Sequence, residues 1–79
     1  MYLCITGFLP DGFDDTSLKF ELDVASECER AVMDILGWES LAAESDGELP
    51  LTSEQVWRIS EVIKTSLPDN LDLFIGVEA

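Results

Sequence analysis

The thiols of Cys4 and Cys28 are the side chains most able to do covalent chemistry in this sequence, which contains no histidine. A cysteine acts as a nucleophile or metal ligand in its thiolate form, which requires a nearby base or positive charge. Cys4 lies in an apolar run and Cys28 on the apolar side of a predicted helix, and the surrounding carboxylates raise a thiol pKa. We therefore expect two free, unreactive thiols, and we predict that the chain has no catalytic residues and is not an enzyme.

Two acidic segments, residues 11–15 and 44–48, group hard oxygen ligands around a glycine. Calcium loops are built in this way, but they place a bidentate glutamate at their twelfth position. Counted from Asp11, that position is Leu22. The glycines of the chain are also too far apart for a phosphate loop or a dinucleotide-binding turn. The sequence therefore predicts solvated acidic loops, with no metal and no cofactor.

Charge is the dominant feature of the composition. The chain has 17 acidic and 4 basic side chains, and its formal net charge is -13 at pH 7. A net charge of about 2–8 in magnitude is enough to keep a small domain soluble, and a larger charge destabilises the compact state by self-repulsion. We infer that the charge serves a strongly basic protein partner. The same charge argues against direct binding of nucleic acid or of an anionic membrane surface.

The chain is expected to fold as one domain over residues 1–79. Hydrophobic residues make up 47% of it, which is more than acidic disordered tails carry. No apolar run approaches the roughly 18 residues of a membrane span. Met1 leads into the apolar residues 2–5 with no basic region, so we expect no secretion signal and a cytoplasmic protein.

Three apolar runs predict strands. The first, residues 2–9, is rich in β-formers and is followed by a proline-containing turn. Residues 18–24 and 71–77 alternate between apolar and polar side chains, as half-buried strands do. The first two strands are expected to form a hairpin through the acidic connection at residues 10–17.

Two helices are predicted between the second and third strands. Residues 26–36 carry a single apolar stripe, with Ser26 and Glu29 placed as a capping box and Gly37 as a left-handed end. An irregular acidic connection is expected at residues 39–50.

The second helix is predicted over residues 52–67. Thr52 and Gln55 are placed as its capping box, and Pro68 stops it. The element order is therefore ββααβ.

The predicted fold class is α+β, a two-layer sandwich in which two helices cover one face of a three-stranded sheet. The favoured strand order is 2-1-3, with the last strand beside the first; the order 1-2-3 is the alternative. Because two helices in succession return the chain to the edge of the sheet that it left, the last strand is expected to run antiparallel to the second.

The first strand is apolar on both of its faces. If Leu3, Ile5 and Leu9 face the helices, an apolar group is left on the uncovered face of the sheet. Such a group is either scattered apolar surface or a face that pairs with another chain. A homodimer through this open face is one alternative, although the net charge of each copy opposes it. The apolar residues expected on the open face are Tyr2, Cys4, Phe8 and Phe74.

In size, acidity, lack of catalytic machinery and compact α+β build, the chain resembles the small acidic immunity proteins that bacteria co-produce with nuclease bacteriocins and polymorphic toxins. The resemblance covers the whole chain and involves no sequence motif, so it assigns no site residue. It implies a one-to-one inhibitor, or antitoxin, that binds a cationic toxin domain at or beside its active site, with a nuclease as the expected target. Opposite charges raise the rate at which such partners meet.

Two other functions are compatible with the composition. One is a nucleic-acid mimic of phage origin, an anti-restriction or anti-defence protein whose carboxylates stand in for phosphates. A mimic needs acids in long rows, whereas an inhibitor needs one acidic patch with aromatic anchors. The other is an acidic dimerisation module or accessory subunit.

We predict that the basic partner docks on two irregular acidic segments, residues 11–15 and 39–48, each with an aromatic side chain close by. A few aromatic anchors supply most of the affinity of an interface, and the charges around them set its association rate. Trp38 is one predicted anchor; its alternative role is a helix-cap residue folded into the core. Glu21 and Asp23 extend the patch if their strand is an edge strand. The predicted partner-binding residues are Phe13, Asp14, Asp15, Glu21, Asp23, Trp38, Glu39, Glu44, Asp46 and Glu48.

Overall fold

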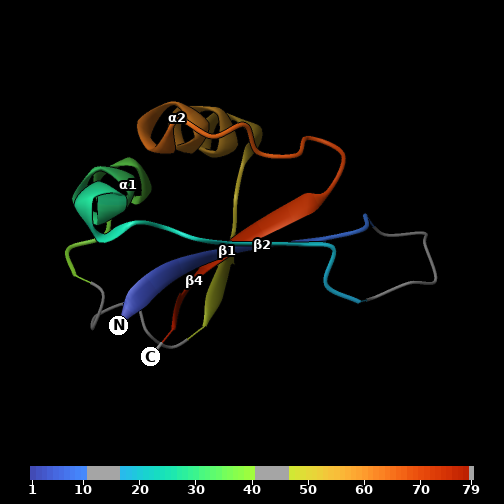
Figure 1. The fold of residues 1–79 in the computed structure, drawn as a ribbon, viewed down its shortest axis with the longest axis horizontal. Coiled ribbons are helices and arrows are strands. Elements are labelled where there is room, and N and C mark those ends of the chain that lie inside the picture. The colour runs from blue at the N-terminus through green and yellow to red at the C-terminus, as the bar shows by residue number, and fades with distance from the viewer. Residues whose placement is uncertain (11–16, 41–46, 79) are drawn as a thin grey trace.

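The computed structural model describes residues 1–10, 17–40 and 47–78, and it confirms the α+β class. Four strands form one antiparallel sheet in the order β2-β1-β4-β3, and both helices lie on one side of it (Figure 1). The elements in chain order are β1 (Tyr2–Phe8), β2 (Phe20–Asp23), the 3-10 turn η1 (Ser26–Cys28), α1 (Glu29–Leu36), β3 (Glu48–Pro50), α2 (Ser53–Ile63) and β4 (Asp72–Glu78).

The sheet has four strands, and the prediction of three was wrong. The additional strand, β3, lies at the end of the connection that was expected to be irregular, and it pairs with β4 so that Leu49 is opposite Ile75. It is only three residues long and ends at Pro50, a residue that sheets accept only at an edge or a bulge. The three predicted strands keep the favoured order, since β1 lies between β2 and β4.

The expected direction of the last strand was also wrong. Both β2 and β4 pair antiparallel with β1, so they run in the same direction. The reason is that the two helices do not follow each other directly. Strand β3 lies between them in the chain and runs antiparallel to β4, which adds one more reversal of direction.

Helix α1 begins and ends through backbone geometry. Ser26 lies inside the 3-10 turn, so its hydroxyl does not cap, and the predicted capping box with Glu29 does not form. At the other end Gly37 has the predicted left-handed conformation, with φ 76°. The N–H groups of Gly37 and Trp38 donate to the carbonyl oxygens of Asp34 (3.3 Å) and Met33 (2.9 Å), the hydrogen-bond pattern of a Schellman motif.

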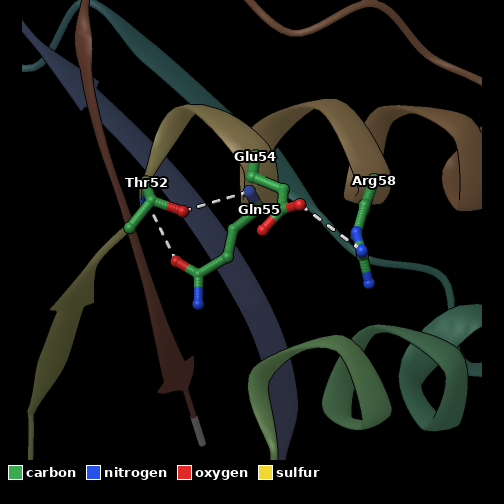
Figure 2. A network of polar contacts seen from close by, with 4 residues as sticks. All are labelled: Thr52, Glu54, Gln55 and Arg58. Carbon is green, nitrogen blue, oxygen red and sulfur yellow. Dashed lines mark hydrogen bonds and ion pairs between the residues drawn. The ribbon is translucent and has the colours of Figure 1, made fainter.

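Helix α2 begins at the predicted capping box and ends earlier than predicted. The Thr52 hydroxyl accepts from the Gln55 N–H at 3.2 Å, and the Gln55 side chain accepts from the Thr52 N–H at 2.9 Å (Figure 2). The helix ends where Lys64 adopts a left-handed conformation with φ 55°. The N–H groups of Lys64 and Thr65 then both donate to the carbonyl oxygen of Ser60. The chain therefore leaves the helix before Pro68 is reached.

The core lies between the sheet and the helices. The side chains of Leu3 and Ile5 on β1 are fully buried between the sheet and the helices. Gly7 lies on the same face of β1, where a side chain would not fit, because an added Cβ atom would lie 2.9 Å from Leu73 Cδ2. The buried core residues are Leu3, Ile5, Val24, Val32, Met33, Ile59 and Ile75.

Candidate functional site

The open face of the sheet is the side of β1 and β4 that neither described helix covers (Figure 1). Successive strand residues point to opposite faces, so the burial of Leu3 and Ile5 against the helices directs the even-numbered residues of β1 outward. The rings of Phe8 and Phe74 meet on this face edge to face, with their centroids 6.0 Å apart. The apolar residues predicted for this face, Tyr2, Cys4, Phe8 and Phe74, occupy it as expected.

The pairing register arranges the side chains of the open face in rows across the sheet. Read from β2 to β3, one row is Asp23, Cys4, Gly76 and Glu48. The neighbouring row is Glu21, Thr6, Phe74 and Pro50. Strands lie about 4.8 Å apart, so the outer carboxylates of the first row are on the order of 14 Å from each other.

Carboxylates also mark the two ends of the open face. Glu78 is opposite Tyr2, and Asp72 is opposite Phe8. Every charged residue in the four described strands is therefore acidic and lies on the open face around an apolar centre. These five open-face carboxylates are Glu21, Asp23, Glu48, Asp72 and Glu78.

The open-face carboxylates create a negative potential that acts on two neutral groups beside them. Burial, followed by the charges of Glu21 and Asp23, raises the pKa of the Cys4 thiol to about 11. Asp23, followed by burial and Glu78, raises the pKa of the Tyr2 phenol. The Cys4 thiol is consequently protonated at neutral pH, and it is a free thiol on the opposite side of the sheet from Cys28.

Thr6 lies at the centre of the open face, between Glu21 on β2 and Phe74 on β4. Its residue is 7% exposed, and among the described residues its Oγ1 atom has no hydrogen-bond partner. A buried polar group without a partner costs stability and is uncommon in folded proteins. Thr6 is therefore a candidate functional residue that reasoning from the sequence did not identify.

The helical layer has a different charge pattern from the open face. It carries Arg30, Arg58 and Lys64 among its acids, and two of these cations form ion pairs within a helix. The Arg30 Nε atom is 3.3 Å from Asp34 Oδ1, and an Arg58 guanidinium nitrogen is 3.4 Å from Glu54 Oε1 (Figure 2). The remaining cation, Lys19, precedes β2 and donates its backbone N–H to the Gly7 carbonyl oxygen.

Three of the predicted partner-binding residues belong to the open face. Glu21 and Asp23 are exposed on β2, which is an edge strand, as their predicted role requires. Glu48 is exposed at the opposite edge of the same face, and its Cγ atom lies close above Gly76. The predicted residues that lie outside the described part of the chain are Phe13, Asp14, Asp15, Glu44 and Asp46.

Trp38 and Glu39 follow α1, in the helical layer. The Trp38 side chain is half-buried and packs against the core, which corresponds to the helix-cap role considered as its alternative. Glu39 is exposed. Neither residue belongs to the four described strands that carry the open-face carboxylates.

The structure has two further surface features of note. A hollow of about 350 Å³ lies between the start of α2 and residues 68–74, with Asp69 and Asp72 among its mainly apolar lining. Trp57 on α2 is 62% exposed, and oppositely charged neighbours, Arg58 and Glu61, lie beside it. Within the described residues, no group of three or more histidine, cysteine or acidic side chains is placed to hold a metal ion.

The described helices include none with the length and apolar character needed to cross a membrane. Comparisons of the chain with protein-family models, with curated proteins and with solved structures gave no match.

Proposed function

We propose that the chain is an acidic protein inhibitor that binds and neutralises a cationic toxin domain, in the manner of an immunity protein. The proposed target is a nuclease, bound one-to-one at or beside its active site in the cytoplasm. The observation that carries the proposal is the unequal distribution of charge. In the four described strands every charged residue is a carboxylate of the open face, whereas the described helices carry acids together with cations.

This arrangement suits a protein target better than a nucleic-acid-like role. The open-face carboxylates lie at the edges and ends of an apolar patch, and they do not form the continuous row that a mimic of a phosphate backbone needs. An apolar centre with a charged rim is the usual anatomy of a protein–protein interface. A negative field also speeds the capture of a basic domain, which matters when the target damages the cell.

Growth rescue in bacteria tests the proposed function. The probe is the protein encoded by the reading frame adjacent to the gene of this chain, expressed from an inducible promoter with and without the chain. We expect the adjacent product to be basic, to arrest growth and to cleave nucleic acid, and we expect the chain to restore growth. A variant such as Ile59→Asp, which puts a charge into the core, controls for expression of an acidic but unfolded chain.

Two results count against the proposal. If the adjacent gene product is harmless, the chain does not have the proposed toxin target. If the adjacent product is toxic and the folded chain does not neutralise it, the chain is not its inhibitor. Inhibition of a host restriction nuclease by the chain would favour the phage anti-defence alternative.

A further inference from the structure

We propose that the open face of the sheet is the docking surface, and that the partner presents to it an apolar side chain ringed by lysine and arginine. This inference rests on the proposed function and makes it more specific, since it names the surface and the chemistry of the partner. It differs from the acidic segments predicted from the sequence. The docking surface consists of the apolar residues Tyr2, Phe8 and Phe74, the central Thr6, and the five open-face carboxylates.

Charge complementarity identifies the occupant. The charged residues of the four described strands are all carboxylates, and the pairing register places Glu21, Asp23 and Glu48 in the two rows that cross Cys4 and Thr6. A second copy of the chain would bring the same charges together at close range. A basic protein surface instead gains attraction at each edge of the sheet.

The open face carries aromatic residues of the kind that anchor interfaces. Tyr2, at the start of β1, is 37% exposed, and the edge-to-face pair of Phe8 and Phe74 lies toward the other end of the strand. Aromatic side chains surrounded by charges are typical of the few residues that dominate binding energy.

The Thr6 hydroxyl is a second and independent observation. It lies on the open face beneath its neighbours and has no hydrogen-bond partner among the described residues. A small shift of a neighbouring side chain gives a partner's donor access to this oxygen. An unpaired polar group in the free protein is then paired in the complex, where it adds specificity.

Trp57 offers the strongest competing surface. It is the most exposed tryptophan of the chain, on the outer side of α2. Its surroundings contain Arg58 and Lys64 as well as Glu61, so no single sign of charge prevails there. A basic partner therefore gains less at this surface, and Trp57 serves as the matched aromatic control.

A titration followed by nuclear magnetic resonance tests the docking surface without the natural partner. The probe is a short synthetic peptide with a central tryptophan flanked by arginines, added to the isotope-labelled chain at low salt. We expect the largest shifts at Tyr2, Thr6 and Phe74 and smaller ones in α1 and α2. Shifts centred on Trp57, shifts spread evenly over all exposed acids, or no shifts would each overturn the inference.

Kinetics with the toxin give the second test. Glu21→Gln combined with Asp23→Asn removes two open-face charges, and Glu27→Gln combined with Glu61→Gln removes two from the helical layer. We expect the first pair to slow association roughly three- to tenfold at low salt and the second pair to have a smaller effect. Equal effects of the two pairs, or a larger effect of the second, would overturn the inference.

Substitutions of Tyr2 and Trp57 give the third test. Tyr2→Ala is expected to speed dissociation of the toxin about tenfold, and Trp57→Ala to leave it nearly unchanged. The reverse result places the interface on α2 and leaves the proposed function intact, whereas failure of growth rescue removes the function. Salt-promoted dimerisation of the chain that Tyr2→Ala abolishes would show instead that a second copy occupies the face.

Discussion

Replacing Thr6 by valine is expected to make the free protein more stable. The substitution keeps the branched shape of the side chain and exchanges a hydroxyl for a methyl group. In the free protein that hydroxyl is buried and has no partner among the described residues, so it contributes a desolvation cost and no compensating hydrogen bond.

The magnitude follows from the cost of an unpaired buried polar group, about 1–3 kcal/mol. Valine also has a higher strand preference than most residues and adds a buried methyl group. We expect the free energy of unfolding to increase by about 1–2 kcal/mol. For a domain of this length, each 1 kcal/mol raises Tm by about 4–8 °C.

Chemical denaturation with parallel thermal melts measures the effect. Thr6→Ser is the control, because it keeps the hydroxyl and removes the methyl group, and we expect it to destabilise the protein. The reasoning is refuted if Thr6→Val is no more stable than the parent, since the hydroxyl would then have a hydrogen-bond partner. If the hydroxyl is paired in the complex, Thr6→Val should weaken toxin binding while it stabilises the free chain.

Three other predictions concern stability. The Lys64→Gly variant should have a free energy of unfolding about 1 kcal/mol higher than that of the Lys64→Ala variant, because both lack the same charge but only glycine adopts the left-handed conformation without strain. Equal denaturant midpoints of the two variants would contradict this. The free energy of unfolding should fall between about pH 9 and pH 11, because the Cys4 thiol loses its proton at lower pH in the unfolded chain than in the folded one. The Cys4→Ala variant should show a smaller fall. A pH profile identical to that of the parent would contradict the raised pKa of Cys4. Stability should rise with sodium chloride up to about 0.15 M, where charge repulsion reaches only roughly 8 Å, and a midpoint unmoved by salt would mean that the acids do not repel one another significantly.

Local signals in the sequence predicted much of the fold. The capping box of Thr52 and Gln55 and the left-handed Gly37 depend on neighbouring residues alone, and both were predicted correctly. The apolar residues on both faces of β1 indicated a central strand, which it is. These features need no knowledge of distant parts of the chain.

The remaining features depend on contacts between distant segments. Strand β3 is too short to have a pattern of its own and exists because β4 offers it a partner. Helix α2 ends at Lys64 through a left-handed residue that is usually glycine, so the sequence carried no signal for that position. The exposed acids of β2 were predicted as part of the site, but their convergence with Glu48 around Thr6 follows from the four-strand register, which was not available from the sequence.

The rate at which the chain associates with the adjacent-gene toxin, measured by stopped-flow fluorescence over a range of salt concentrations, tests the central claim most directly. The proposal predicts a one-to-one complex whose association rate falls steeply as salt rises, with a shallower dependence for Glu21→Gln combined with Asp23→Asn. An association rate that does not depend on salt, or the absence of any complex with a basic and growth-arresting product, would contradict the claim that the charge of this chain serves capture of a cationic toxin.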